Sequence, residues 1–201
     1  MAYWKSYQSD SKNPLPLFRE ILKRSIHIHH PRYIGHQICP TLPVSALSAL
    51  LSALLNNGMA IYEMGSASTA IEKVVCDFFL QQVGYPKTGD ALLTSGGTLA
   101  NLTALLSARS EKAGINVWEN GSGDSPQLAL MVSEEAHYCI DRAVRVMGWG
   151  ALGIIKIPTN ADFKMEKEAL EIAFKNAEDS GVKIIALVGS ACTTSTGTYD
   201  D

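Results

Sequence analysis

The distribution of apolar residues predicts helices in the first part of the chain. A short helix is predicted near residues 17–25, within a stretch to residue 40 that is otherwise irregular. A clearer helix follows, because leucines recur at intervals of three and four residues, as on one face of a helix. These leucines are Leu47, Leu50, Leu51, Leu54 and Leu55. The rest of this helix carries few charges, so we expect it to be covered on more than one side, for instance by a second subunit.

A further helix is predicted over residues 69–82. Thr69 and Glu72 have the spacing of a capping box, in which two side chains bond to the first free N–H groups of a helix. The apolar stripe of this helix comprises Ile71, Val74, Val75, Phe78 and Phe79.

From residue 91 onward, short apolar runs alternate with amphipathic stretches. The runs predict buried strands and the stretches predict helices, the last of which is closed by Gly181. This alternation is typical of an α/β layered fold with a mostly parallel sheet. The predicted strands are 91–94, 128–132, 153–157 and 183–190, and the predicted helices are 98–110, 136–147 and 165–179.

Composition and charge give no support for a nucleic-acid-binding, membrane-spanning or secreted protein. The chain has 201 residues, enough for a domain with a real core. A net charge of −3 gives no electrostatic case for binding nucleic acid or an anionic membrane. No apolar stretch has membrane-spanning length, and the polar start lacks the apolar region of a signal peptide. Four scattered cysteines without a CxxC pair predict reduced thiols in a cytoplasmic protein.

The run TSGGTLANLTALLSAR, from Thr94 to Arg109, holds the strongest chemical signal. Glycines before a helix let backbone approach a ligand, while the N–H groups and positive end of the helix attract an anion such as phosphate. The run lacks the GxGxxG and GxxxxGK[ST] nucleotide motifs. Glycines that serve only packing are the alternative interpretation.

Three more segments accompany this run: residues 62–72 (YEMGSASTAIE), 135–148 and 188–200 (VGSACTTSTGTYD). In this order and spacing, the four motifs resemble the group II pyridoxal-phosphate-dependent amino acid decarboxylases, which include aromatic amino acid, glutamate and diaminobutyrate decarboxylases. Residues 30–43 look like the family's N-terminal substrate-side segment, and the resemblance runs from about Pro31 to the last residue.

The resemblance implies a fold and a division of the chain. The fold is the fold type I large domain of pyridoxal-phosphate-dependent transferases, here incomplete. Residues 1–60 would form an N-terminal arm with helices at a dimer interface. Residues 61–201 would form the first part of the cofactor-binding domain.

The resemblance also implies roles for single residues. Gly97 and Thr98 match positions that bind the cofactor phosphate. His137 matches a histidine that stacks on the pyridine ring and can position the substrate carboxylate. Thr194 matches a threonine near the ring and its phenolic oxygen, and Thr69 matches a residue of the substrate carboxylate pocket.

Simpler interpretations stand beside these roles. Thr69 could serve only as a helix cap, His137 as an ordinary polar residue at a helix start, and Thr194 as a partner for loop backbone. The histidines at 27, 29 and 30 lack cysteine or carboxylate partners at ligand spacing, so we expect no metal site.

Two positions depart from the family pattern. Cys192 stands where glycine often precedes the paired threonines, and its β-carbon would shift the loop if the backbone needs a positive φ. Ser66 stands where many members have proline.

The family's chemistry also needs a lysine that forms a Schiff base with the cofactor and an aspartate on the pyridine nitrogen. Both lie downstream of the threonine segment in the family. Asp200 matches the aspartate that closes this segment, and neither Lys156 nor Lys183 matches the family lysine. We therefore expect the N-terminal portion of a larger enzyme, inactive alone, whether as a fragment, a split protein or a truncated product. An incomplete sheet would also expose an edge that a partner chain must cover.

The function implied is decarboxylation of an L-amino acid to an amine and CO2, by a cytoplasmic homodimer that uses pyridoxal phosphate. One rival is another fold type I enzyme, a lyase or desulfurase, although Thr193–Thr194 and residues 69–72 favour the decarboxylase. A second rival is a non-catalytic truncated chain that binds a homologous full-length subunit. The GHQ stretch, residues 35–37, leans towards small bacterial-type amino acid substrates.

Overall fold

The computed structural model describes residues 4, 7, 12–35, 38–121, 123 and 126–201. His36 and Gln37 of the GHQ stretch lie outside the described residues. The chain divides between Thr69 and Ala70 into two units. Within the described ranges, no helix is both long and apolar enough to cross a membrane.

The first unit contains helices that bury almost nothing. Helix α2 (Leu15–Arg24) and helix α3 (Pro43–Leu55) each carry proline in the first turn, where its missing N–H costs no hydrogen bond. Asn56 ends α3 in the left-handed conformation. The five leucines of α3 are 57–75% exposed, so the described residues of this chain do not supply the cover that its composition predicts.

Helix α4 (Ser66–Gln82) follows the short 3₁₀ helix η1 (Tyr62–Met64) and begins earlier than predicted. The capping-box prediction is wrong, because the N–H of Thr69 already donates to the carbonyl of Gly65, as inside a helix. The Thr69 hydroxyl donates to the same carbonyl over 2.9 Å. Glu72 instead accepts the N–H of Leu93.

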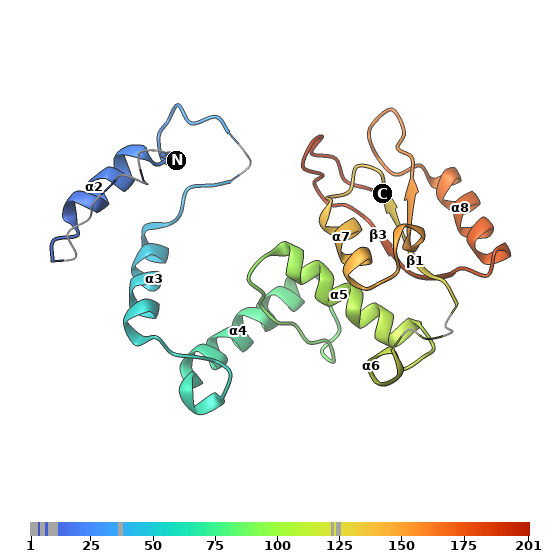
Figure 1. Ribbon diagram of the computed structural model, residues 1–201, viewed down its shortest axis with the longest axis horizontal. Helices are drawn as coiled ribbons and strands as arrows, with labels where there is room; N and C mark the ends of the chain where they lie inside the picture. Colours follow the sequence, from blue (N-terminus) through green and yellow to red (C-terminus); the bar gives the residue numbers. More distant parts are fainter. Residues whose placement is uncertain (1–3, 5–6, 8–11, 36–37, 122, 124–125) are drawn as a thin grey trace. The chain divides into compact units, whose positions relative to one another are not determined.

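The second unit is built on three parallel strands in the order β2-β1-β3. They are β1 (Leu128–Ser133), β2 (Ile154–Ile157) and β3 (Lys183–Val188). Helices α5 (Gly97–Lys112) and α7 (Cys139–Val146) cover one face, and α8 (Lys167–Asp179) covers the other (Figure 1). The α/β fold with a parallel sheet is confirmed.

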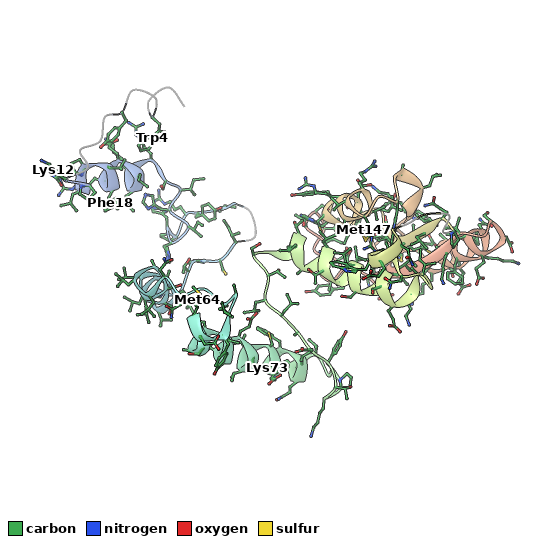
Figure 2. The ribbon with its side chains drawn as sticks, turned by 60° about the horizontal axis from the view of Figure 1, so that its bottom comes forward. Trp4, Lys12, Phe18, Met64, Lys73 and Met147 are labelled. Carbon is green, nitrogen blue, oxygen red and sulfur yellow. The ribbon has the colours of Figure 1, made fainter. Side chains whose placement is uncertain are left out.

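All of β1 is buried, because it is the central strand and is covered on both faces. Leu130 and Val132 join the core with α5 and α7, whereas Met131 joins the core beside α8. Figure 2 shows Met147, which follows α7, among closely packed side chains of this unit. On β3, which ends the described sheet, Leu187 stays half-exposed.

The strand predicted over 91–94 does not form, although every residue of that range is described. Its apolar side chains are exposed. The N–H groups of Ala91 and Leu93 donate to the carboxylates of Asp90 and Glu72, so side chains hold this segment instead of a neighbouring strand.

The other strands and helices predicted from the apolar pattern are present, with ends that shift by a few residues. Gly181 follows α8 with a φ of +71°, and its N–H bonds to the carbonyl of Glu178, which confirms the predicted helix end. Among the described residues, three short elements were not predicted: the 3₁₀ helices η1 (Tyr62–Met64) and η2 (Ala151–Gly153), and helix α6 (Val117–Asn120).

Candidate functional site

The end of β3 and the connections that follow β1 and β3 border a hollow of about 250 Å³. Ligands of parallel α/β sheets bind at this carboxyl edge. His137, from the connection after β1, and Thr194, from the connection after β3, both line the hollow although they are far apart in the sequence. The other lining residues are Asn101 of α5, Ala136 and Ile140 beside His137, and Val188–Thr193.

His137 lies in the tight connection between β1 and α7. Its Nδ1 accepts the backbone N–H of Cys139 over 3.2 Å. A neutral imidazole in this arrangement carries its hydrogen on Nε2. The ring is exposed, and its centre is 4.2 Å from that of Tyr138 at a tilt of 33°. It therefore offers a planar face and one N–H donor to a ligand.

The threonine loop, residues 189–198, has a rigid base. Thr193 is buried, and its hydroxyl bonds to those of Thr196 and Thr198, which also bond to each other over 2.7 Å. Asp200 closes the loop, because its carboxylate accepts the N–H groups of Ser190 at 2.8 Å and Met165 at 2.7 Å. The loop thus carries Thr194 on a fixed support.

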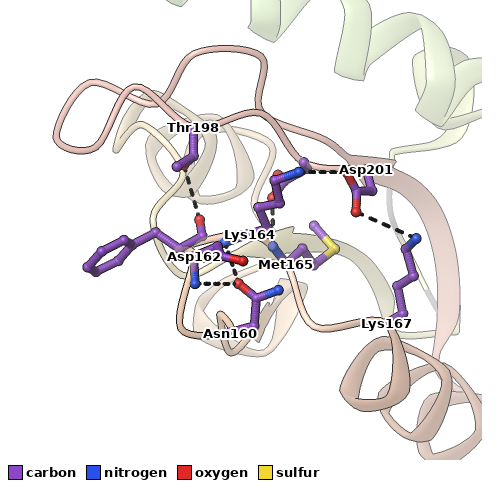
Figure 3. A network of polar contacts seen from close by, with 9 residues as sticks. Asn160, Asp162, Lys164, Met165, Lys167, Thr198 and Asp201 are labelled. Carbon is purple, nitrogen blue, oxygen red and sulfur yellow. Dashed lines mark hydrogen bonds and ion pairs between the residues drawn. The ribbon is translucent and has the colours of Figure 1, made fainter.

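A polar network anchors the end of this loop to the turn before α8 (Figure 3). Asn160 Oδ1 accepts the N–H groups of Asp162 and Lys164, which closes the turn. Lys164 Nζ lies 2.8 Å from Asp201, an ion pair that raises the pKa of the lysine and lowers the pKa of the aspartate. The network fixes the chain immediately after the loop.

Cys192 lies in this loop with a φ of +67°. The left-handed backbone costs a residue with a β-carbon about 1–2 kcal/mol. The departure from glycine therefore falls where the backbone does have a positive φ, and the loop adopts that conformation with a cysteine in place.

The glycine turn, residues 94–98, leads into α5 and borders a second hollow of about 340 Å³. A β-carbon added at Gly96 or Gly97 would meet nothing within 4 Å, so packing does not explain either glycine. Gly96 has a φ of 162°, which is extended backbone, so conformation does not explain it either. Among the described residues, the N–H groups of Gly97 and Thr98 have no acceptor. These N–H groups and the open space suit a bound phosphate.

Two contributions to the site were missed from the sequence. Asn101 lies one helical turn after Thr98, lines the hollow beside His137, and donates to Cys139 Sγ over 3.2 Å. The sequence could have indicated Asn101, because this residue belongs to the run Thr94–Arg109 that contains the glycines. The hydrogen bond between Ser195 and Glu135 had no signal, because the two residues are 60 positions apart.

Thr69 lies in the first unit. Its part in the substrate carboxylate pocket stays a prediction. In the portion of the chain that the structure covers, no three histidine, cysteine, aspartate or glutamate side chains form a group that could hold a metal ion.

Comparison with known proteins identifies the family that this chain resembles. The sequence profile of the pyridoxal-dependent decarboxylase conserved domain matches residues 17–201, a match that begins before Pro31. An L-2,4-diaminobutyrate decarboxylase of Acinetobacter baumannii is 30% identical over 88% of this chain and 37% of its own length. An aromatic-L-amino-acid decarboxylase of Bacillus atrophaeus is 27% identical over 96% of this chain and 38% of its own length.

A solved structure is similar over the whole chain. It is the glutamate decarboxylase domain of diaminobutyrate-pyruvate transaminase and L-2,4-diaminobutyrate decarboxylase from Vibrio parahaemolyticus. The TM-score is 0.91 at 26% identity, and the match covers 100% of this chain and 46% of that one. The chain thus spans less than half the length of these relatives.

Proposed function

Because the chain belongs to the pyridoxal-dependent decarboxylase family, we propose that it forms part of the cofactor site of an enzyme that converts an L-amino acid to an amine and CO2. The observation that carries this proposal is the hollow at the carboxyl edge of the sheet, which His137 and Thr194 line together. The glycine turn begins α5, the helix that also contributes Asn101 to this hollow.

The residues of this chain suit pyridoxal phosphate. The N–H groups of Gly97 and Thr98 would bind its phosphate at the positive end of α5. The exposed ring of His137 would hold the pyridine ring in place, and its Nε2–H would donate to the substrate carboxylate. The Thr194 hydroxyl would lie near the phenolic oxygen. When bound, the cofactor supplies the electron sink for the pair left behind by CO2.

We propose that the lysine and the aspartate of the family's chemistry come from outside these 201 residues, in the same polypeptide or in a partner chain. Lys183 is engaged elsewhere, because its Nζ donates to the carbonyl of Ala113 over 3.0 Å. We further propose a cytoplasmic homodimer with residues 1–60 at its interface. The four free cysteines support this location, and the exposed leucines of α3 support the interface.

The test uses the protein isolated from its source, with any longer or associated chain retained. Pyridoxal phosphate is added, and CO2 release is measured from 2,4-diaminobutyrate, glutamate and the aromatic amino acids. Borohydride treatment and mass spectrometry then locate the lysine linked to the cofactor. CO2 from one substrate class supports the proposal. Cofactor binding with another reaction instead of CO2 release would favour a lyase or desulfurase, and absence of binding would contradict the proposal.

A further inference from the structure

A hydrogen bond spans the two segments that carry His137 and Thr194. Ser195 Oγ donates to Glu135 Oε2 over 2.8 Å. Ser195 directly follows Thr194, and Glu135 precedes His137 by two residues. This contact therefore joins the two sides of the hollow immediately beside the residues that line it.

Both ends of this contact are anchored. The N–H of Glu135 donates to the hydroxyl of Ser133, a buried residue at the end of β1. On the other side, Ser195 follows the buried Thr193 and its cluster of hydroxyls. Between these anchors, Thr194 and Ser195 are exposed. The hydrogen bond thus connects the exposed part of the threonine loop to the fixed connection after β1.

We propose that Ser195 and Glu135 form a latch that sets the separation between Thr194 and His137, and that both are positioning residues for the bound cofactor. This inference rests on the proposed function. A hydroxyl that donates to a carboxylate forms a stronger hydrogen bond than a neutral pair does. Solvent competes for this exposed pair, so its contribution is modest. Loss of the hydrogen bond should raise the population of the locally open state about 2- to 10-fold without unfolding the protein.

The first experiment measures backbone hydrogen exchange in the intact protein without cofactor. Ser195→Ala and Glu135→Ala should each raise exchange about 2- to 10-fold in both segments, residues 134–138 and 190–198. Exchange in the double variant should be no faster than in either single variant, because all three variants lose the same contact. Ser195→Thr keeps the hydroxyl, so its exchange rates should equal those of the parent protein. Ser180→Ala is the matched control, since it removes an exposed serine hydrogen bond at the end of α8.

The second experiment titrates the same variants with pyridoxal phosphate. Ser195→Ala should weaken cofactor binding about 2- to 10-fold, and Ser195→Thr should restore it. Faster exchange confined to the mutated segment, or unchanged cofactor affinity, would overturn the latch. If no amino acid is decarboxylated, the proposed function fails, while the exchange experiment still decides whether the two segments are coupled.

Discussion

Replacement of Gly97 by alanine should separate phosphate binding from the stability of the fold. Gly97 is the first residue of α5, and an added β-carbon meets nothing within 4 Å. A glycine-to-alanine change at a compatible position raises stability by about 0.4–1 kcal/mol, because the unfolded chain loses freedom. We therefore expect the free energy of unfolding of the cofactor-free protein to stay level or rise by up to about 1 kcal/mol.

The same methyl group would occupy the space from which a phosphate approaches the N–H groups of Gly97 and Thr98. A hydrogen bond to a charged group contributes about 1.5–3 kcal/mol. Its loss should weaken binding of pyridoxal phosphate by about 10- to 150-fold. Denaturant unfolding gives the first quantity, and titration with the cofactor gives the second.

Gly181 provides the opposite control. Its φ is +71°, and a β-carbon there also meets nothing within 4 Å, so alanine costs only backbone strain. Gly181→Ala should lower stability by about 1 kcal/mol and leave cofactor affinity unchanged. The reasoning is refuted if Gly97→Ala binds the cofactor like the parent, or if it loses stability as the packing interpretation requires.

Three further substitutions test the site, the core and one surface carboxylate. In the intact enzyme, His137→Ala should abolish CO2 release and leave cooperative thermal unfolding in place, because the ring is exposed and loses only the hydrogen bond that its Nδ1 accepts from Cys139; full activity would remove its assigned role. Leu130→Ala should destabilise the protein by about 2–5 kcal/mol in denaturant unfolding, since this side chain is fully buried. Glu134 accepts the N–H and the hydroxyl of Thr159, which hold its pKa below the ordinary 4.5. Glu134→Gln should therefore lower stability above pH 4.5, and the difference from the parent should vanish as the pH falls through the lowered pKa; a pH-independent difference would contradict this.

Much of the second unit could be predicted from its apolar pattern. Strands such as β1 and β3 are continuous apolar runs, because each packs between layers of helix. The run at residues 91–94 is also mainly apolar, but it does not form a strand. Its N–H groups bond to the carboxylates of Glu72 and Asp90 instead. Whether an apolar run forms a strand depends on which hydrogen-bond partners lie beside it in the folded protein, and the local sequence does not specify these partners.

The candidate site likewise could be predicted only in part from the sequence. The motifs predicted that His137 and Thr194 act together, and the structure places both on one hollow. Thr69 was predicted as a cap from its spacing alone, but helix α4 begins before it. The Ser195–Glu135 contact follows from how β1 and β3 end beside each other, which no local pattern encodes.

The most direct test is a crystal structure of the intact protein with pyridoxal phosphate bound. We expect the phosphorus atom at the N-terminus of α5, within hydrogen-bond reach of the N–H groups of Gly97 and Thr98. The pyridine ring should lie against His137, with Thr194 near its phenolic oxygen. A cofactor bound elsewhere, or a phosphate held away from the glycine turn, would contradict the account.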